Sequence, residues 1–408
     1  MDAHEDIQSA FIEGSAMNLP TADTVPVSTL RPQRHDALPH MDRLVVGAGF
    51  FGLHGALVMA RRGLRVAILD ADAEPMMRAS QVNQARVHNG YHYPRSLTTA
   101  LSSVHYYGQF VRDFAEAVNT RFDQIYAIAR SQSFMSPDGF ELFCRRAGVQ
   151  CDPVDPGQWF RNGTVESAYR TDEYSFDAER LRRIMTTQVA DTPGVSWYQP
   201  ARMAHVDRDA DGFTILLEDG RRLRADGILN ASYAGTNQVL TLLGEAPLSL
   251  KYELCEIILT NVSDGLRGVG LTVMDGEYFS LMPYGLSGFH SLTSVGFTPH
   301  RVSHDATPHF SCQARNAVCN DTALDNCSFC PEAPSSSWPF VSQMTRRYLG
   351  DQHTVRFGES LYAVKTVLKT TEVDDARPTM IIQHSAEPWL TSVLSGKIAT
   401  IYDLDEAP

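Results

Sequence analysis

The stretch from Arg43 to Asp70 restricts the fold more than any other part of the chain. RLVVGAG is typical of a short buried strand that runs into a glycine turn, FFGLHGALVMARRG of a helix closed by Gly63, and LRVAILD of a second strand. The turn carries Gly47, Gly49 and Gly52 as G-x-G-x-x-G between strand and helix. The first glycine permits a tight turn, the second lets the backbone approach a pyrophosphate, and the third lets the helix pack closely. The pattern predicts a β-α-β dinucleotide-binding unit.

The ends of this unit supply the other contacts that a dinucleotide needs. The N–H groups and the positive dipole end of the helix, at Phe50 and Phe51, are expected to face the phosphates. Asp70, followed by Ala71, ends the second strand where an acid accepts a hydrogen bond from a ribose 2′-hydroxyl. The same negative charge repels a 2′-phosphate, so NADP is the least expected dinucleotide. The unit by itself leaves FAD and NAD open.

Composition and charge are those of an acidic globular protein. The 408 residues, 43% of them hydrophobic, suffice for a large core shared by two domains. A net charge of -13 opposes binding to phosphate backbones, so nucleic acid is not an expected partner. No apolar run approaches the roughly 20 residues of a bilayer span, and the first residues are acidic where a secretory signal is basic. We therefore expect a cytoplasmic protein without a membrane span that acts on a small molecule.

Helical and strand-rich regions follow one another along the rest of the chain. Residues 1–40 lack a sustained apolar period and predict a loosely ordered extension. Helices are expected at 96–119, 175–190 and 338–348, strands at 228–230 and over much of 248–299, and a hairpin turn at Asp219-Gly220. The end of the chain predicts a final strand, TMIIQH, and a short helix, GKIATIYDL.

The segment LVVGAGFFGLHGALVMARRGLRVAILDAD resembles the N-terminal FAD-binding signature of the D-amino-acid-oxidase-like flavoproteins. That family includes glycine and sarcosine oxidases and glycerol-3-phosphate and 2-hydroxyglutarate dehydrogenases. ADGILNASYAGTNQV is similar to the family's later strand, with Tyr233 interrupting its small-residue run, and SFDAERLRRIMTTQV is similar to the helix before it. The likeness is strong over 42–98 and 172–240 and faint over 244–350. It implies bound FAD.

The resemblance implies an α/β protein in which a Rossmann-like FAD-binding domain carries an inserted, mostly antiparallel β-sheet substrate domain of α+β type. The FAD-binding domain would consist of 41–98, 172–243 and 350–408. The substrate domain would consist of 99–171 and 244–349, with a cysteine-rich loop at 304–335. The strand-rich pattern over 248–299 agrees with such an insertion.

The loop QARVHNGYHYPRS, residues 84–96, is the expected catalytic segment. It resembles the GVIHAGIYY segment of the family's hydroxy-acid and glycerol-phosphate dehydrogenases, with His88 at the family's histidine. A histidine is suited to accept a substrate O–H or N–H proton near neutral pH, and His92 is a second candidate. Arg86 or Arg95 is a candidate to hold a substrate carboxylate by a two-pronged contact. The alternatives are that His88 and Asn89 hydrogen-bond the flavin or the backbone, and that Arg95 caps the next helix or pairs with an acid.

The segment SVLSGKIATIYDL resembles the stretch where family members bring a helix N-terminus to the flavin. The N–H groups of Gly396, Lys397 and Ile398, or the Lys397 ammonium, would stabilise negative charge on the reduced ring. A solvated surface lysine is the alternative for Lys397. DARPTM matches the family's Arg-Pro segment, which makes Arg377 a candidate for contact with substrate or flavin.

Four of the seven cysteines, Cys312, Cys319, Cys327 and Cys330, fall within one short segment. Four thiolates can hold a tetrahedral zinc ion that pins a long loop, so a structural zinc is one expectation. Loose reduced thiols and a redox-active or disulfide role are the alternatives. A catalytic metal is not expected, because all four ligands would come from the protein.

The sequence and the resemblance together predict an FAD-dependent oxidoreductase that oxidises a C–N or C–O bond by hydride transfer to flavin N5. The substrate would be a small polar molecule such as an amino acid, amine, hydroxy acid or sugar-derived metabolite. The electron acceptor would be O2 or another carrier. Two other interpretations remain: a flavin-binding protein without turnover and an NAD-linked dehydrogenase.

Overall fold

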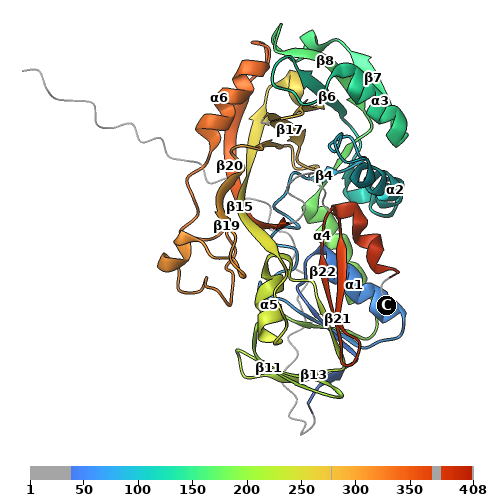
Figure 1. Cartoon of the computed structure of the whole chain (residues 1–408), viewed down its shortest axis with the longest axis vertical. Coiled ribbons are helices and arrows are strands. Elements are labelled where there is room, and N and C mark those ends of the chain that lie inside the picture. The colour runs from blue at the N-terminus through green and yellow to red at the C-terminus, as the bar shows by residue number, and fades with distance from the viewer. Residues whose placement is uncertain (1–37, 277, 370–377, 407–408) are drawn as a thin grey trace, which may run out of the picture. The chain divides into compact units, whose positions relative to one another are not determined.

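A computed structural model describes residues 38–276, 278–369 and 378–406 (Figure 1). The extension predicted at 1–40 therefore lies almost entirely outside the described residues, and so does Arg377. Within the described part, no helix combines the length and the apolar character needed to cross a bilayer.

A six-stranded sheet carries the predicted β-α-β unit. Its strand order is β10-β3-β2-β14-β22-β21, parallel except for β21, which runs antiparallel to β22. The strands are β2 (Arg43–Val46), β3 (Val66–Leu69), β10 (Val195–Tyr198), β14 (Gly227–Asn230), β21 (Met380–Ser385) and β22 (Trp389–Leu394). Every residue of β3, β14 and β22 is buried, as expected for parallel strands covered on both faces.

The helices α1 (Phe50–Arg61) and α4 (Ala178–Ala190) pack against each other beside this sheet. Both confirm predicted helices. Gly63, which closes the α1 turn, has a φ of 85°, a left-handed conformation that glycine adopts without steric cost. Asp177 caps α4, because its side chain accepts a hydrogen bond from the Arg180 N–H.

A four-stranded sheet of order β1-β13-β12-β11 contains the predicted hairpin. Its strands are β1 (His40–Met41), β11 (Met203–Asp209), β12 (Gly212–Leu217) and β13 (Arg222–Ala225). The turn between β12 and β13 lies at Asp219-Gly220 as predicted, with Gly220 at a φ of 85°.

The inserted sheet has nine strands and is mostly antiparallel; only β16 and β6 run parallel. Figure 1 shows its two long strands, β15 and β20, side by side along most of their length. Its members are β6 (Asp123–Ala129), β7 (Cys151–Val154), β8 (Val165–Thr171), β15 (Leu250–Val262), β16 (Val269–Met274), β17 (Phe279–Pro283), β18 (His290–Ser294), β19 (Pro299–Ser303) and β20 (Val355–Leu368). The helices α3 (Pro137–Ala147) and α6 (Trp338–Tyr348) lie beside this sheet.

Short elements connect the two large sheets. A three-stranded sheet joins β4 (Arg86–Val87) and β5 (Val118–Asn119) through β9 (Tyr174–Phe176). The remaining helices are α2 (Leu97–Asp113), α5 (Thr236–Leu242) and the 3-10 helices η1 (Ala115–Ala117), η2 (Pro156–Gln158), η3 (Tyr233–Gly235), η4 (Asp264–Leu266), η5 (Ser311–Arg315) and η7 (Ile398–Leu404). The pairing of Arg86 with Ser175 brings the opening loop, 84–96, beside residue 173.

The end of the chain differs from the prediction of one final strand. TMIIQH is followed by a second strand, β22, which lies inside the main sheet between β14 and β21. The carboxyl ends of β2, β14 and β22 therefore meet at one edge of the sheet, at Val46, Asn230 and Leu394. In open α/β sheets this edge is where ligands bind.

Candidate functional site

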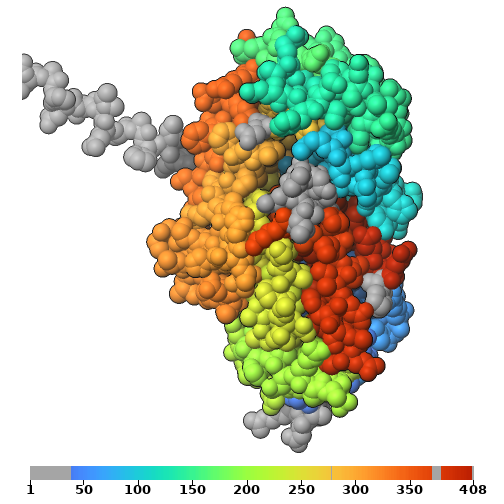
Figure 2. All heavy atoms as spheres, in the orientation of Figure 1, coloured from blue at the N-terminus to red at the C-terminus, as the bar shows by residue number. Residues whose placement is uncertain are grey.

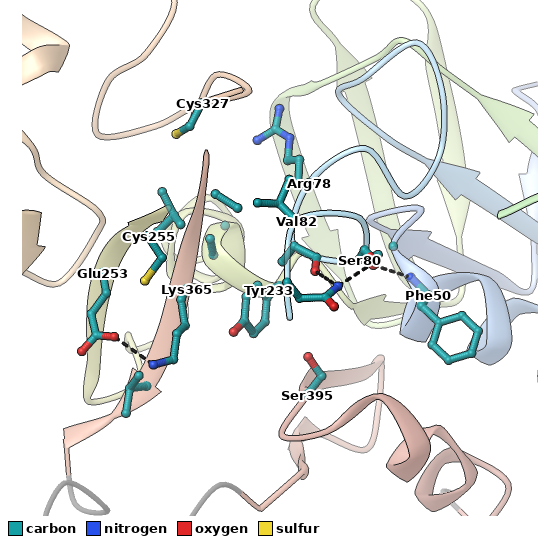
Figure 3. A pocket seen from close by; sticks show the side chains of 18 of the residues that line it. Phe50, Arg78, Ser80, Val82, Tyr233, Glu253, Cys255, Cys327, Lys365 and Ser395 are labelled. Atoms are coloured by element: carbon teal, nitrogen blue, oxygen red, sulfur yellow. Dashed lines mark hydrogen bonds and ion pairs between the residues drawn. The ribbon is translucent and has the colours of Figure 1, made fainter. Parts of the chain in front are cut away.

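A cavity of about 1330 Å³ lies where the carboxyl edge of the parallel sheet faces the inserted sheet. Figure 3 shows the glycine-turn side, marked by Phe50 and Ser80, and the inserted-sheet side, marked by Glu253 and Lys365, with Tyr233 between them. The volume exceeds the 300 to 1,000 Å³ that is usual for a single small ligand. It is large enough for a dinucleotide together with a small substrate.

The glycine turn has no space for a Cβ atom at two of its positions, so only glycine fits there. Gly47 has a φ of +105°, and a Cβ there would lie 2.6 Å from the carbonyl oxygen of Ala231. A Cβ on Gly52 would lie 1.9 Å from the carbonyl oxygen of Gly47, so α1 packs directly against the turn. Gly52 itself does not line the cavity, whereas Gly47, Gly49, Phe50 and Phe51 do. The geometry at Gly47 and Gly52 agrees with the tight turn and the close helix packing expected of these two glycines.

Asp70 and Ala71 line the cavity at the end of β3. One Asp70 carboxylate oxygen accepts a hydrogen bond from the Ala48 N–H at 2.5 Å, and the other accepts one from the Asp72 N–H at 2.8 Å. Burial raises the pKa of Asp70, against the effect of these two hydrogen bonds. Next to it, Arg78 makes a two-pronged contact with Asp72, with both nitrogen-to-oxygen distances at 2.7 Å.

The two histidines of the opening loop lie side by side on the cavity wall, with ring centroids 5.7 Å apart. The His88 side chain keeps 15% of its surface exposed, and its Nδ1 lies 3.7 Å from Glu173 Oε1. Burial lowers the pKa of His88 to about 4; Glu173 opposes this shift, and the charges of Lys397 and Arg86 add to it. Burial, with the charge of Arg86, also lowers the pKa of His92. Both imidazoles are therefore neutral at pH 7 and able to accept a proton.

Arg86 binds other protein side chains and does not offer the two-pronged substrate contact that was considered for it. Its guanidinium forms a fully buried ion pair with Glu173 and donates to Tyr126 Oη at 2.6 Å. The other terminal nitrogen donates to Thr272 Oγ1 at 2.9 Å and to Ser280 Oγ at 2.7 Å. Both terminal nitrogens of Arg86 are occupied by protein groups. Arg86 therefore holds the floor of the site in place and cannot make a two-pronged contact with a substrate carboxylate.

Lys397 is buried, which excludes the solvated alternative considered for it. Only 8% of its surface is exposed, and its Nζ donates a hydrogen bond to Tyr93 Oη. The same nitrogen lies 3.6 Å from the centre of the Tyr93 ring. Burial, with the charge of Arg86, lowers the pKa of Lys397 well below its usual value. Gly396 and Ile398 line the cavity on either side, and the Gly396 N–H donates to Thr379 Oγ1 at 3.0 Å.

Two other loop residues have structural partners. Asn89 does not line the cavity: its side chain donates to the Asp172 carbonyl at 2.8 Å and its N–H to Glu173 Oε1 at 3.0 Å. Arg95 lines the cavity but forms an ion pair with Asp275 at 2.9 Å, as the second alternative for it proposed. Asn89 thus holds the backbone of the loop.

The zinc site expected from the cysteine cluster is not supported. Within the described chain, no three His, Cys, Asp or Glu side chains are arranged to hold a metal ion. Cys312, Cys319, Cys327 and Cys330 line one small cavity of about 20 Å³ beside Phe310 and Leu324. Burial raises the pKa of Cys327 to about 12 and also raises that of Cys319, which opposes the thiolate form that zinc requires. The segment, orange in Figure 2, lies at the surface and packs Cys312, Cys319 and Cys327 within an apolar cluster.

Sequence reasoning missed two residues that complete the site, Glu173 and Tyr93. Glu173 lies in the loop between β8 and β9, in the plain context RTDEYSF, and no motif distinguishes it there. Tyr93 lies inside the loop that was singled out, so its position next to two histidines was the available signal. The structure also brings Lys251, Glu253 and Lys365 together on the cavity wall, where Glu253 lies 2.9 Å from each lysine Nζ.

The cavity fits FAD, the cofactor implied by the resemblance. At Gly47 and Gly52 the turn is packed so closely that a Cβ would collide with the backbone. The helix α1 begins at the edge of this turn, and no side chain caps its first N–H groups, which are the groups that bind phosphates. Three buried polar atoms of residues that line the cavity, Arg86 Nε, His88 Nδ1 and His92 Nδ1, have no hydrogen-bond partner among the described residues. The residues that would hold the cofactor are those of the turn, Asp70, and Gly396 to Ile398.

Two FAD-dependent monooxygenases of fungi are similar to this chain in sequence. FPY4, an FAD-dependent monooxygenase of Fusarium mangiferae, is 24% identical over 368 residues, which cover 88% of this chain and 87% of that protein. The FAD-dependent monooxygenase kojA of Aspergillus flavus is 25% identical over 248 residues, covering 59% of this chain and 57% of that protein.

Solved structures show that the fold is shared as well. NikD, described as an unusual amino acid oxidase essential for nikkomycin biosynthesis, aligns with a TM-score of 0.65 at 14% identity, covering 90% of this chain and 94% of that one. L-α-glycerophosphate oxidase from Mycoplasma pneumoniae with FAD bound gives 0.64 at 12% identity, with coverage of 90% and 93%. Glycine oxidase from Geobacillus kaustophilus gives 0.62 at 12% identity, with the same coverage.

The family model described as FAD dependent oxidoreductase matches residues 42–320, which include the glycine turn, the opening loop, Glu173 and the inserted sheet as far as β19. This match covers more than half of the chain. The protein belongs to the D-amino-acid-oxidase-like family of FAD-dependent oxidoreductases.

Proposed function

We propose that this protein oxidises a C–N or C–O bond of a small polar substrate, with His88 as the base that accepts the substrate proton. The observation that carries the proposal is the placement of His88. It lines the cavity, its imidazole is neutral at pH 7, and a carboxylate, Glu173, lies 3.7 Å from its Nδ1. This arrangement favours the tautomer with the proton on Nδ1 and leaves Nε2 as the acceptor.

Bound FAD would supply the oxidising chemistry by accepting a hydride from the substrate carbon. The protein must then orient that C–H bond, exclude water and take up the O–H or N–H proton. Deep burial of the loop around His88 excludes water, and the Arg86–Glu173 pair holds the loop backbone through the Asn89 N–H.

The substrate class within this proposal is an amino acid, amine, hydroxy acid or sugar-derived metabolite. A cavity wall that carries Lys251, Glu253 and Lys365 supports a polar substrate. The solved relatives named above act as amino acid, glycine or glycerophosphate oxidases, and these names set the first compounds to test. The electron acceptor in this proposal is O2 or another carrier.

A second candidate is oxygen insertion into a substrate, because FPY4 and kojA are named FAD-dependent monooxygenases. A flavin monooxygenase takes its electrons from NADH or NADPH, whereas the first proposal takes them from the substrate itself. The two candidates therefore differ in which reagent reduces the flavin in the absence of oxygen.

The test is anaerobic reduction of the purified yellow protein. Its cofactor is first released and identified, which separates FAD from NAD. The protein is then mixed with a panel of amino acids, amines, hydroxy acids and polyols, and separately with NADH and NADPH. Bleaching by a panel member supports the proposal; bleaching by NADPH alone supports the monooxygenase. Retained colour with every reagent indicates a flavin-binding protein without turnover.

A further inference from the structure

Three side chains form a line along one wall of the cavity: His88, Tyr93 and Lys397. His88 Nε2 lies 3.5 Å from Tyr93 Oη, and Lys397 Nζ donates a hydrogen bond to the same oxygen. The three groups come from the opening loop and from the C-terminal segment, 304 residues apart in the chain. Tyr93 and Lys397 are 7% and 8% exposed, so the line is shielded from bulk water over most of its length.

We propose that Tyr93 and Lys397 form the path by which the substrate proton leaves His88, with Lys397 as the final acceptor. This inference rests on the proposed function. The proton of the substrate O–H or N–H bond moves to His88 Nε2 as that bond breaks, while the electron pair leaves separately with the hydride. Lys397 Nζ donates to Tyr93 Oη at rest, so the amine first turns its lone pair toward the Tyr93 hydroxyl. The proton on Nε2 then passes to Tyr93 Oη as the Tyr93 hydroxyl proton passes to Lys397 Nζ. His88 and Tyr93 end unchanged, and Lys397 ends as an ammonium ion.

The chemistry of the three groups sets this direction. An amine is a stronger base than an imidazole in comparable surroundings, so a shared proton resides on the lysine. A phenol both donates and accepts a hydrogen bond, which allows Tyr93 to hand on one proton while it receives another. The 3.5 Å separation of His88 Nε2 and Tyr93 Oη is at the outer limit for a hydrogen bond, and such contacts tighten when substrate binds.

The charges around the line keep Lys397 able to accept a proton. Among the described residues, the charged and titratable groups facing Lys397 and His88 are Arg86, Glu173 and His92. Arg86 is neutralised by Glu173, yet its charge still disfavours a second cation nearby. Burial and the charge of Arg86 both favour the neutral amine form of Lys397, the form that can accept a proton. After turnover its ammonium is adjacent to the electron-rich Tyr93 ring, 3.6 Å from its centre, which stabilises the cation.

The first experiment needs no substrate. FAD-loaded protein labelled with ¹³C at histidine Cε1 is titrated by NMR from about pH 3 to about pH 10, a range that spans the lowered imidazole titration and that of a shifted amine. The His88 signal is assigned from its absence in His88→Gln. A connected line predicts a second inflection in that signal, at higher pH than the imidazole titration, as Lys397 titrates, and this inflection should be lost in Lys397→Met. Lys369→Met is the matched control, because Lys369 lies outside the cavity and donates to the His304 carbonyl. An inflection that survives Lys397→Met overturns the proposal.

The second experiment uses whichever compound bleaches the flavin. Tyr93→Phe removes one hydroxyl and keeps the ring; it should slow anaerobic flavin reduction by at least about tenfold, and Lys397→Met by a similar factor. The double variant should be no slower than the slower single variant, because the two groups act in one path. Tyr107→Phe, which removes a buried hydroxyl with no partner among the described residues, should react as the parent does. Losses that multiply in the double variant, or a Tyr93→Phe rate equal to the parent's, overturn the path.

The two experiments separate this inference from the proposed function. If no compound bleaches the flavin but the second inflection depends on Lys397, the proposed function fails and the connected line stands. If a substrate bleaches the flavin and Tyr93→Phe is unaffected, the proposed function stands and the path through Tyr93 is wrong.

Discussion

Arg86 and Glu173 form an ion pair whose side chains are 1% and 0% exposed. Glu173 also accepts hydrogen bonds from Tyr126 Oη at 2.6 Å and from the Asn89 N–H at 3.0 Å. Burial acts to raise the pKa of Glu173, but the charge of Arg86, the neighbouring His88 and the Tyr126 hydrogen bond outweigh it, so the pKa is lowered. This one carboxylate therefore joins β4, the opening loop and the inserted sheet, and it places a negative charge beside His88.

Removing the charge of Glu173 should destabilise the protein strongly. Glu173→Gln leaves the Arg86 guanidinium buried without a counter-ion, and breaking a buried pair in this way costs about 3 to 5 kcal/mol of unfolding free energy. Urea unfolding measures the change. The control is Glu179→Gln, whose carboxylate pairs with Arg182 on the surface and should contribute about 1 kcal/mol or less. Equal effects of the two variants would contradict the role given to Glu173.

Replacing His88 should slow the chemical step and spare the cofactor. His88→Gln removes the base but keeps a polar side chain, so we expect anaerobic flavin reduction by substrate to slow by about 10² to 10⁴. Stopped-flow absorbance gives the rate, and the ratio of flavin to protein absorbance gives FAD content, which should stay unchanged. His105→Gln, on the exposed face of α2, is the matched control. A reduction rate like that of the parent would remove His88 as the base.

The glycine turn can be tested through FAD content alone. An alanine at Gly52 would place its Cβ 1.9 Å from the Gly47 carbonyl oxygen, so α1 must move away from the turn. We expect FAD affinity to fall by at least about tenfold. That loss corresponds to only about 1.4 kcal/mol of binding free energy. Gly108→Ala is the control: it lies in the interior of α2, where alanine favours the helix and its Cβ meets only the Arg112 side chain, at 3.4 Å. Full FAD content in Gly52→Ala would contradict the close packing of this turn.

The stability of the protein should fall in acid because His290 is buried in the neutral form. Burial lowers the pKa of His290 from 6.5 to about 4, so below pH 6.5 the unfolded state binds the extra proton first. Stability is complete above pH 6.5 and decreases by about 3 kcal/mol as the pH falls to 4. His290→Gln, which can still donate to the Val269 carbonyl, should flatten this part of the profile. Urea unfolding at pH 7 and pH 4 tests it; an equally steep acid loss in the variant would exclude His290 as its source.

Local patterns in the sequence were sufficient for the β-α-β unit. Gly47 to Asp70 specify a turn, a helix and a strand through contacts close in the chain, and the structure places all three as predicted. The hairpin at Asp219-Gly220 and the helix α6 were predictable for the same reason. The prediction failed for β22, which was missed although it pairs with β14, a strand more than 150 residues away in the chain. For the cysteine cluster, the zinc alternative is not supported among the described residues.

The sequence by itself determined the dinucleotide-binding turn and the loop that carries His88, because both depend on residues within one short segment. Only the tertiary structure decided what surrounds His88. Glu173 lies 87 residues from Arg86 in the chain, and Lys397 lies 304 residues from Tyr93, and no local pattern encodes either contact. The physical reason is burial: charges hidden from water must find partners wherever the fold brings them, and these partners set the pKa of the residue that the sequence had identified.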